Sequence, residues 1–426
     1  APTATLSLLR SRMHQRGYHS SGRAVKEVET VNNCLLVGLH LGREVLPRHP
    51  SAVAQFLFES ALVSNWADSQ NQISTMTVTL DSYFPRGRFF SRPPKGSVGT
   101  TTVNLPIIRE CLLAISAARQ FLTWRKSNRR GVVVLCLHYL PVSAALLLLS
   151  SLTRIPMVVV FTDLPLFSYS ADRVAAMPWW KKPLMRRYRK ATEWLAAQYD
   201  GFVLFTQAMD PVVNPGAKPS IVVEGIYNDE GIPLPSPDKT PGAIAHAGTL
   251  DRAYGIANLL DAFATISKND AQLWLFGSGD MDDEIAERAI ADPRIIHFGF
   301  LQRRDLFEHL SRASVLAVLR DPSEEFTQYS FPSKLFEYLA TGSVVATTAL
   351  AGIPEPYFDH LVRIELDSPE AVGQQLVAIM LSEFEELRRR GESGREFVLS
   401  QKTPEAQTAR IRTFVLEVAS KHKDSE

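Results

Sequence analysis

The sequence predicts an α/β protein with two doubly wound parallel sheets. Short and nearly continuous apolar runs recur along it, such as GVVVLCLHYL, IPMVVVFTD and DGFVLFTQ in the first half and AIAHAGTL, AQLWLFGSGD and SVLAVLR in the second. Apolar runs of this length between helical stretches are typical of parallel strands that are covered on both faces. A proline-rich segment, IPLPSPDKTPG, lies between the halves and predicts a linker, because proline removes backbone donors.

These patterns divide the chain into five parts. We expect a basic tail at 1–30, a first domain at 31–230, a linker at 231–242, a second domain at 243–404, and a C-terminal helix at 405–426 that crosses back to the first domain. The tail has several arginines and no acidic residue before position 27. A disordered tail and an organelle targeting peptide both have this composition, and we favour the disordered tail.

The composition indicates a folded protein and excludes several classes. Hydrophobic residues make up 45% and charged residues 21% of the 426 residues, which is not the composition of a disordered chain. The net charge is only +1, so no overall field attracts nucleic acid, and any anion site must be local. The cysteines Cys34, Cys111 and Cys136 lack metal-ligand spacing, and we predict buried thiols in a reducing compartment.

Two segments bear on membrane contact. The apolar run from Val142 to Leu152 is too short to span a bilayer and predicts a buried helix. Between Trp179 and Lys190 basic residues cluster beside two adjacent tryptophans, which is typical of a segment that contacts an anionic membrane surface. A helix there would have a single apolar stripe, made of Leu184, Tyr188, Ala191, Leu195 and Tyr199. Packing of that stripe against the first sheet is the alternative, and both remain open.

The strongest local signal for chemistry is YSFPSKLFEYLATG in the second half. Pro332 and Ser333 precede a predicted helix, whose first free amides and dipole favour an anion. Lys334 adds a full positive charge in the same turn. Glu337 follows one turn later, where its carboxylate could accept hydrogen bonds from the two hydroxyls of a ribose. These features together favour a nucleoside diphosphate, and a capped surface helix is the alternative.

Two other strand-to-helix loops contain glycines. In HAGTLDRAYG, Gly248 allows a ligand to approach the backbone closely, and Arg252 could reach phosphate oxygens. In LFGSGD, Gly277 and Gly279 directly follow a strand. The third glycine of G-x-G-x-x-G and the acidic residue that would bind a ribose are both missing, so a dinucleotide site for hydride transfer is poorly supported.

The order of these loops resembles the donor half of retaining family-4 glycosyltransferases with the GT-B fold. HAGTLDRAYG, LFGSGD, IIHFGFL and YSFPSKLFE follow one another as the corresponding loops do in that family. The resemblance is clear from Ala243 to about Glu355 and weak before Gly131. It implies two Rossmann-like domains, the first on the acceptor side and the second binding a nucleotide sugar.

The resemblance also implies roles for individual residues of the second half. Gly248 would face the donor diphosphate, and Glu337 would bind the ribose. The remaining donor-binding candidates are Thr249, Arg252, Gly277, Gly279, Phe300, Leu301, Tyr329, Ser330, Ser333 and Lys334. In this set Phe300 and Leu301 would meet the base through their main chain.

The chain departs from the family at three positions. Tyr329 replaces the first glutamate of the Glu-x7-Glu motif, Thr249 replaces the arginine of the Gly-Arg pair, and Tyr254 replaces a lysine. Two cations beside a diphosphate are thereby lost, and we predict that Arg252 and Lys334 substitute for them.

On the acceptor side, four residues are candidates. Asp163 ends the strand MVVVFTD, and His138 ends GVVVLCLH; with Arg252 and Lys334 they are our candidates for catalytic roles. A strand-end aspartate often caps a helix, and a lone histidine is more often a packing residue, which we slightly favour for His138. Gly42 and Arg43 lie in the first strand-to-helix loop, which in GT-B enzymes approaches the acceptor.

The sequence therefore predicts a hexosyltransferase. It would move a sugar from a nucleotide-diphosphate sugar to a hydroxyl of a glycan or lipid-linked glycan with retention, without a metal or cofactor, in the cytoplasm or peripherally at a membrane. No cluster of His, Asp or Glu has metal-ligand spacing. The alternatives are a non-catalytic GT-B-like binding or scaffold protein and a nucleotide-sugar epimerase.

Overall fold

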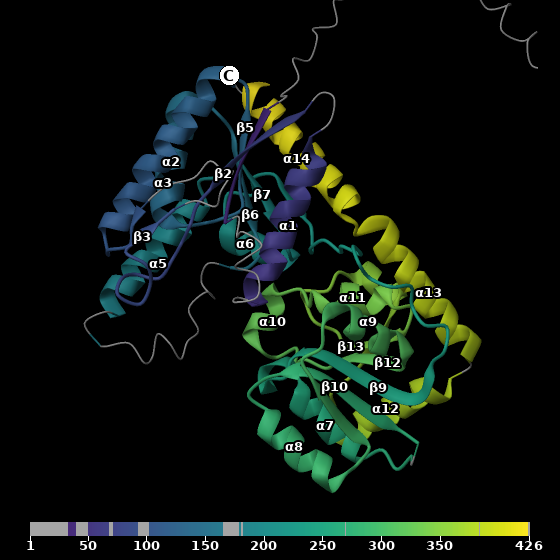
Figure 1. Cartoon of the computed structure of the whole chain (residues 1–426). Helices are drawn as coiled ribbons and strands as arrows, with labels where there is room; N and C mark the ends of the chain where they lie inside the picture. The colour runs from purple at the N-terminus through teal and green to yellow at the C-terminus, as the bar shows by residue number, and fades with distance from the viewer. Residues whose placement is uncertain are drawn as a thin grey trace, which may run out of the picture. The chain divides into compact units, whose positions relative to one another are not determined.

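The computed structural model describes residues 33–39, 50–67, 71–92, 102–164, 179, 182–268, 270–382 and 384–424. Two six-stranded sheets, both parallel throughout, organise these residues (Figure 1). The prediction of two doubly wound sheets is confirmed. The predicted tail at 1–30 lies outside the described residues.

The first sheet has the strand order β2-β1-β5-β6-β7-β8. Its strands are β1 (Asn33–Gly38), β2 (Gln72–Thr77), β5 (Val132–Leu135), β6 (Met157–Phe161), β7 (Gly201–Leu204) and β8 (Ser220–Val222). Alternate residues of one strand enter different cores, as Leu35 and Leu36 do. This pattern explains the continuous apolar runs, because both faces of the sheet are covered.

Helices cover both faces of the first sheet. They are α1 (Pro50–Trp66), α2 (Ile108–Ser127), α3 (Leu140–Thr153), α5 (Lys182–Ala196) and the short α6 (Asp210–Val213), which follows the 3-10 turn η2 (Gln207–Met209). Helices α2, α3 and α5 contribute to one core and α1 to the other (Figure 1). A small antiparallel pair, β3 (Phe90–Ser91) and β4 (Thr102–Val103), precedes α2.

The second sheet has the strand order β11-β10-β9-β12-β13-β14. Its strands are β9 (Thr240–Thr249), β10 (Gln272–Ser278), β11 (Ile295–Gly299), β12 (Ala313–Val318), β13 (Val344–Thr348) and β14 (Leu361–Ile364). Strand β9 begins at Thr240, inside the segment 231–242 that we predicted as linker, and it runs through the end of that segment.

The second sheet is also covered on both faces. One core includes residues of α7 (Ile256–Ala264), α8 (Asp282–Ala291) and α12 (Pro369–Leu381). The other includes residues of α9 (Arg303–Arg312), α11 (Lys334–Ala340) and α13 (Phe384–Gln401). Short elements occupy the loops: the 3-10 turns η3 (Arg252–Tyr254) and η4 (Glu355–Asp359) and the helix α10 (Glu325–Tyr329).

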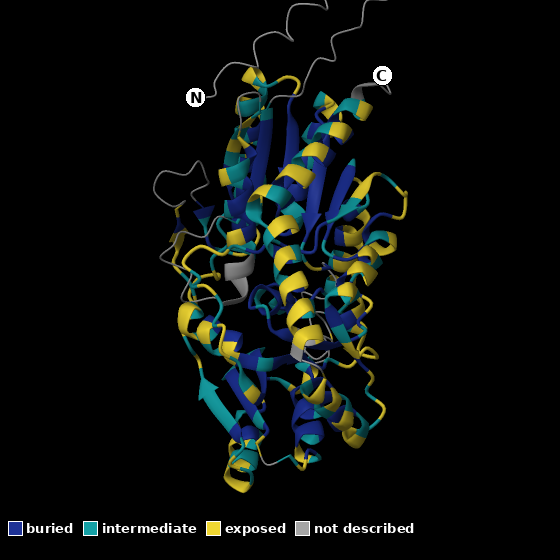
Figure 2. Cartoon of the chain, turned by 90° about the vertical axis from the view of Figure 1, so that its right-hand side faces the viewer, coloured by how far each residue is buried: buried dark blue, intermediate teal, exposed yellow. Residues whose placement is uncertain are grey.

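The last helix, α14 (Pro404–Asp424), packs on the first sheet although it follows the second in sequence. Ile411, Val415 and Val418 share a core with Leu36 and Val134. Most strand residues in both sheets are buried, whereas the outward faces of the helices are exposed (Figure 2).

Burial corrects three sequence-based expectations. Cys34 and Cys136 are buried as predicted, but Cys111 is exposed, because the inward face of α2 is instead formed by Leu113, Ala117 and Phe121. The apolar run from Val142 to Leu152, which we predicted to be a buried helix, lies in α3 and is only half buried, with Leu148 and Leu152 exposed. In α5 the buried residues are Thr192, Leu195 and Ala196, so the predicted stripe was wrong at Leu184 and Ala191, which are exposed.

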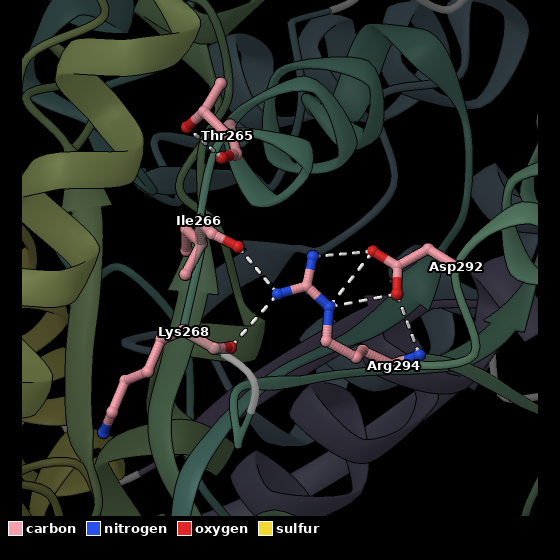
Figure 3. Close-up of polar contacts among 6 residues, drawn as sticks. Thr265, Ile266, Lys268, Asp292 and Arg294 are labelled. Carbon is pink, nitrogen blue, oxygen red and sulfur yellow. Dashed lines mark hydrogen bonds and ion pairs between the residues drawn. The ribbon is translucent and has the colours of Figure 1, made fainter.

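A polar cluster closes the amino edge of the second sheet (Figure 3). Arg294, directly before β11, donates hydrogen bonds to the carboxylate of Asp292 and to the carbonyl oxygens of Ile266 and Lys268. These bonds join the chain after α7 to the start of β11. The cluster lies at the end of the sheet opposite to the strand-to-helix loops, so we assign it a structural role.

Candidate functional site

The order of strands in the second sheet locates its ligand site. The chain proceeds outward from β9 through β10 to β11, and then restarts on the other side of β9 with β12. In doubly wound sheets ligands bind at the carboxyl ends of the strands where the strand order reverses, a place called the switch point. Here that point lies between β9, which ends in Gly248 and Thr249, and β12, which is followed by Leu319 and Arg320.

Gly248 leaves space at this point. Its φ of +146° lies in the region that favours glycine. A Cβ atom added there would come no closer than 4.0 Å to the nearest atoms, which are His246 Nε2 and Lys334 Cε. The structure therefore brings Lys334 next to Gly248 and leaves open space against the backbone, and the contact of these two residues with a diphosphate stays a prediction.

Glu337 lies one turn after Lys334 and interacts with two cations. Lys334 Nζ is 2.7 Å from Glu337 Oε2, and Arg303 Nε is 3.7 Å from Glu337 Oε1. All three side chains are partly exposed, so a ligand can reach them. Arg303 also donates a hydrogen bond to the Asn228 carbonyl, which fixes it at this position. A small pocket borders Glu337 and Arg303 and is otherwise lined by apolar residues such as Ile232 and Leu306.

Arg320 is a third cation at the switch point, and the sequence analysis did not identify it. Its guanidinium lies over the ring of Tyr254, 4.7 Å from the centroid. Desolvation lowers the pKa of Arg320, and no carboxylate of the described residues forms an ion pair with it. Tyr254 stands where the family that the sequence resembles has a lysine. Its ring instead holds the guanidinium of Arg320, a different cation, near that position.

His246 connects these groups. Its Nδ1 donates to the Ala317 carbonyl at 2.8 Å, because a carbonyl oxygen can only accept, and this leaves Nε2 as the lone-pair nitrogen beside Gly248. Desolvation, together with the charges of Arg320 and Lys334, lowers the pKa of His246 to about 4. His246 is therefore neutral at physiological pH and adds no positive charge to the site.

The other glycines of the donor side have a packing role. A Cβ at Gly277 would lie 1.9 Å from the Gly248 carbonyl oxygen, and one at Gly279 would lie 2.3 Å from the Leu250 carbonyl carbon. Both glycines therefore let the loops after β9 and β10 pack against each other, and their contact with a nucleotide remains a prediction. Thr249 is exposed at the end of β9.

The predicted base-binding turn is open to solvent. Gly299 has a φ of +67°, and Phe300 after it is 80% exposed. Leu301 is partly buried against the core of this domain. The exposed ring and the adjacent main chain leave this turn accessible to a base.

Arg252 does not lie with Lys334. Its guanidinium forms an ion pair with Glu284 of α8 at 2.6 Å, and its side chain is mostly exposed. A contact with a diphosphate would require this ion pair to break. Arg320 is therefore a better substitute for the missing cations than Arg252 in this conformation.

Tyr329, Ser330 and Ser333 lie in the segment that leads into α11. The carbonyl of Tyr329 accepts a hydrogen bond from Thr206 at 3.3 Å, and Tyr329 also packs against the core of the first sheet. The Ser330 hydroxyl is buried and has no hydrogen-bond partner among the described residues. Ser333 is exposed at the start of α11 and makes no side-chain cap.

The acceptor-side candidates differ in environment. Asp163 follows β6 and is exposed, yet desolvation by the surrounding protein raises the pKa of its carboxyl group. His138 Nε2 donates to the Thr192 carbonyl at 3.1 Å, and its Nδ1 lies 2.9 Å from the Tyr199 hydroxyl. Since both ring nitrogens of His138 are already bonded and desolvation lowers its pKa to about 4, this geometry favours the packing interpretation. Gly42 and Arg43 lie outside the described residues.

The first sheet also has a switch point, between β1 and β5, which the sequence analysis did not identify. Gln55 donates from Nε2 to the Cys136 carbonyl at 3.1 Å and to Glu59 Oε1 at 3.0 Å. Glu59 Oε1 in turn accepts from the Leu39 amide at 3.2 Å. Desolvation raises the pKa of Glu59 to about 7. One turn of α1 thus bridges the ends of the two strands.

The described residues contain neither a candidate metal site nor a candidate membrane span. No group of three or more His, Cys, Asp and Glu side chains in this part of the chain could hold a metal ion. No helix there is both long enough and apolar enough to cross a bilayer.

The comparisons with known proteins agree with this geometry. Residues 241–383 match the family model described as glycosyl transferases group 1. The matched region is confined to the second half of the chain. The match begins within β9 and ends after α12, so it includes Gly248, Arg320, Lys334 and Glu337. A search of curated proteins with the sequence finds no match.

Solved structures resemble the whole described fold. Sucrose-phosphate synthase from Thermosynechococcus elongatus has a TM-score of 0.60 at 15% identity, covering 91% of this chain and 99% of that one. HepE from Anabaena, in complex with UDP, has a TM-score of 0.60 at 11% identity, covering 90% and 99%. The pneumococcal O-GlcNAc transferase GtfA, in complex with UDP and GlcNAc, has a TM-score of 0.54 at 10% identity, covering 92% and 99%. At these identities the similarity shows the fold, which is GT-B.

Proposed function

We propose that this protein is a retaining glycosyltransferase that transfers a hexose from a nucleotide-diphosphate sugar to a hydroxyl of a glycan or lipid-linked glycan. The observation that carries the proposal is the arrangement at the switch point of the glycosyltransferase domain. Gly248 leaves open space there, and Lys334 and Arg320 place two positive charges near it. Open backbone flanked by cations fits a diphosphate.

The residues have separate tasks in this proposal. Lys334 and Arg320 stabilise the diphosphate as it leaves, which is where negative charge develops. Glu337 accepts hydrogen bonds from the ribose, after Lys334 turns from Glu337 to the phosphates. The bond between the anomeric carbon and the phosphate oxygen breaks, and the acceptor oxygen bonds to that carbon. The acceptor proton passes to a phosphate oxygen of the leaving group, so the scheme requires neither a metal nor a side-chain base.

The acceptor would bind at the carboxyl edge of the first sheet. Asp163 is exposed there, and its carboxylate could accept a hydrogen bond from a sugar hydroxyl. The names of two similar structures include UDP, and we therefore propose a uridine nucleotide as donor.

We also propose that the segment between Trp179 and Lys190 contacts an anionic membrane peripherally. Trp179 before α5 is 82% exposed and Leu184 in its first turn 69%, whereas the buried residues of α5, which are Thr192, Leu195 and Ala196, lie in its last turns. Such a contact would bring a lipid-linked acceptor to the protein.

Ligand-induced stabilisation tests the donor site. UDP at a hundred times its Kd should stabilise the folded protein by about 2.7 kcal/mol and raise its melting temperature. GDP and ADP should have smaller effects. Glu337→Ala should abolish the shift with UDP, because the ribose loses its carboxylate partner, and should change the melting temperature without ligand only slightly.

The matched control is Glu370→Ala, since Glu370 is an exposed glutamate in the first turn of α12. Glu370→Ala should keep the full shift with UDP. An equal shift in Glu337→Ala would remove Glu337 from the ribose role. Product analysis separates the rival functions: a transferase releases UDP from a UDP-sugar, an epimerase converts the UDP-sugar into its epimer without releasing UDP, and a scaffold leaves the UDP-sugar unchanged.

A further inference from the structure

An exposed aromatic cluster lies on residues 82–92, a segment that ends in β3 and that we call the aromatic loop. Phe84, Phe89 and Phe90 are 49%, 40% and 56% exposed. Their rings contact one another edge to face, with centroid distances of 5.5 Å between Phe84 and Phe89 and 4.8 Å between Phe89 and Phe90. Three adjacent phenylalanines on a surface are unusual for a region with no partner.

The aromatic loop is held in place by a buried asparagine. Asn104 is fully buried, its carbonyl accepts from the Phe84 amide at 2.9 Å, and its amide donates to the Phe89 carbonyl at 2.8 Å. The side chain of Asn104 also donates to the Arg88 carbonyl and to the Ser91 hydroxyl, both at 2.6 Å. These bonds fix both arms of the loop, so the rings are displayed outward by a defined backbone.

Cations are interleaved with the rings. Arg86, Arg88 and Arg92 are exposed, and none of the three forms an ion pair with a carboxylate of the described residues. Just beyond β4, Ile107 and Ile108 at the start of α2 add further exposed apolar surface, 76% and 47%. Aromatic rings among unpaired arginines match the interface of an anionic bilayer, where rings enter the headgroup region and cations meet lipid phosphates.

The aromatic loop lies at the carboxyl edge of the first sheet. The hydroxyl of Tyr83 bonds to Glu110 at the start of α2, and Arg109 donates to the Tyr139 hydroxyl at 3.2 Å. Tyr139 follows β5 and directly precedes α3. Because β5 and β6 are parallel neighbours, their carboxyl ends, and therefore Asp163, lie at the same edge.

We propose that the aromatic loop, with Ile107 and Ile108, inserts into the surface of an anionic lipid bilayer and docks the first domain with its acceptor edge toward the membrane. This contact is separate from α5. A protein partner is less suited to this surface, because the three arginines would each need an acidic residue opposite. The membrane contact requires no transferase activity; only the conclusion that the acceptor is lipid-linked rests on the proposed function.

Flotation with vesicles of equal parts phosphatidylglycerol and phosphatidylcholine tests the proposal. The full chain should float, and Phe84→Ser/Phe89→Ser/Phe90→Ser should lower the floated fraction at least fivefold. The matched control replaces three apolar residues of the second half that are even more exposed, Leu234→Ser/Ile290→Ser/Leu381→Ser, and should float like the unmodified chain. Arg86→Gln/Arg88→Gln/Arg92→Gln should weaken binding and reduce its dependence on salt.

Three results would overturn the proposal: no flotation of the unmodified chain, equal flotation of the phenylalanine variant, or dimers in solution that disappear in that variant while vesicles are not bound. The last result would identify the loop as an interface between protein copies. A circular dichroism melt of each variant shows whether it is folded. The thermal shift with UDP is measured in parallel, so a failed donor site and a failed membrane contact give different results.

Discussion

At the scale of single residues, the two switch points contain polar groups whose protonation follows from burial. His246 and His138 are held neutral by desolvation, which excludes them as cationic ligands at neutral pH. Glu59 is the opposite case, because desolvation raises the pKa of its carboxyl group to about 7, which lies within the range of cellular pH. Its carboxyl group lies beside Gly38, where an added Cβ would be 2.3 Å from Oε2, so the end of β1 leaves it little freedom to move.

Glu59 gives the first domain a pH-dependent stability. Its pKa is higher in the folded than in the unfolded chain, so its contribution to stability is complete below about pH 4.5 and is lost as the pH rises through about 7. The loss is on the order of 3 kcal/mol. Glu59→Gln keeps the acceptor oxygen for Leu39 and Gln55 and cannot ionise, so it should raise the melting temperature at pH 8 and leave it nearly unchanged at pH 5.

Thermal melts between pH 5 and pH 8 measure this effect. The control is Glu287→Gln, since Glu287 is an exposed glutamate on α8. It should leave the pH profile of the unmodified chain unaltered. Parallel profiles for the unmodified chain and Glu59→Gln would show that Glu59 does not titrate in this range.

At the scale of elements, the sequence predicted the strands and the residues directly at their ends, but not the neighbours of those residues. Gly248, Lys334 and Glu337 lie in a recognisable loop and helix start. Arg320 follows an ordinary strand and becomes part of the site only because β12 pairs with β9. The aromatic loop has neither helical nor strand periodicity, so no pattern marked it, although its alternation of aromatic and basic residues was a usable signal.

Helix faces were the other weak point, for a different reason. In α5 the predicted stripe is right at Leu195 and wrong at Leu184 and Ala191, because only the last turns of the helix are buried, where the face also includes Thr192 and Ala196. Cys111 lies among apolar residues in sequence but points outward. Apolar neighbours along a helix therefore do not by themselves predict burial.

The pairing of Arg320 with Tyr254 predicts a graded series of variants. Arg320→Gln should weaken UDP binding about ten- to a hundredfold, the loss expected for a charge-assisted hydrogen bond to phosphate. Arg320→Lys should recover part of the affinity. Tyr254→Phe should bind nearly as well as the unmodified chain, and Tyr254→Ala should bind less well, because the ring face holds the guanidinium.

Titration calorimetry with UDP measures this series. Arg304→Gln is the matched control, because Arg304 is an exposed arginine near the base-binding turn with no ion pair among the described residues. Unchanged affinity in Arg320→Gln would show that Lys334 alone supplies the charge. A loss in Tyr254→Phe equal to that in Tyr254→Ala would instead assign the hydroxyl, not the ring, to binding.

At the scale of the whole molecule, the chain leaves the first sheet after β8 and returns to it with α14. The return is fixed by a buried ion pair: Lys402 Nζ lies 2.9 Å from Glu224 Oε2, and their side chains are only 7% and 8% exposed. The Tyr227 amide donates to the Lys402 carbonyl at 2.8 Å, which adds a backbone bond to the same junction. The segment between β8 and β9 is thereby tied to the end of α13.

Replacing one partner of this ion pair should destabilise the folded protein more than replacing both. Lys402→Met leaves the Glu224 carboxylate buried without its cation and should lower the free energy of unfolding by about 3–5 kcal/mol. Glu224→Gln/Lys402→Met removes both charges and should recover much of this loss, because neither variant side chain then has to be desolvated as an ion. Urea unfolding of the single and double variants measures the coupling. Additive losses would mean that the two charges act independently, and the junction would then depend on the Tyr227 backbone bond and the packing of α14.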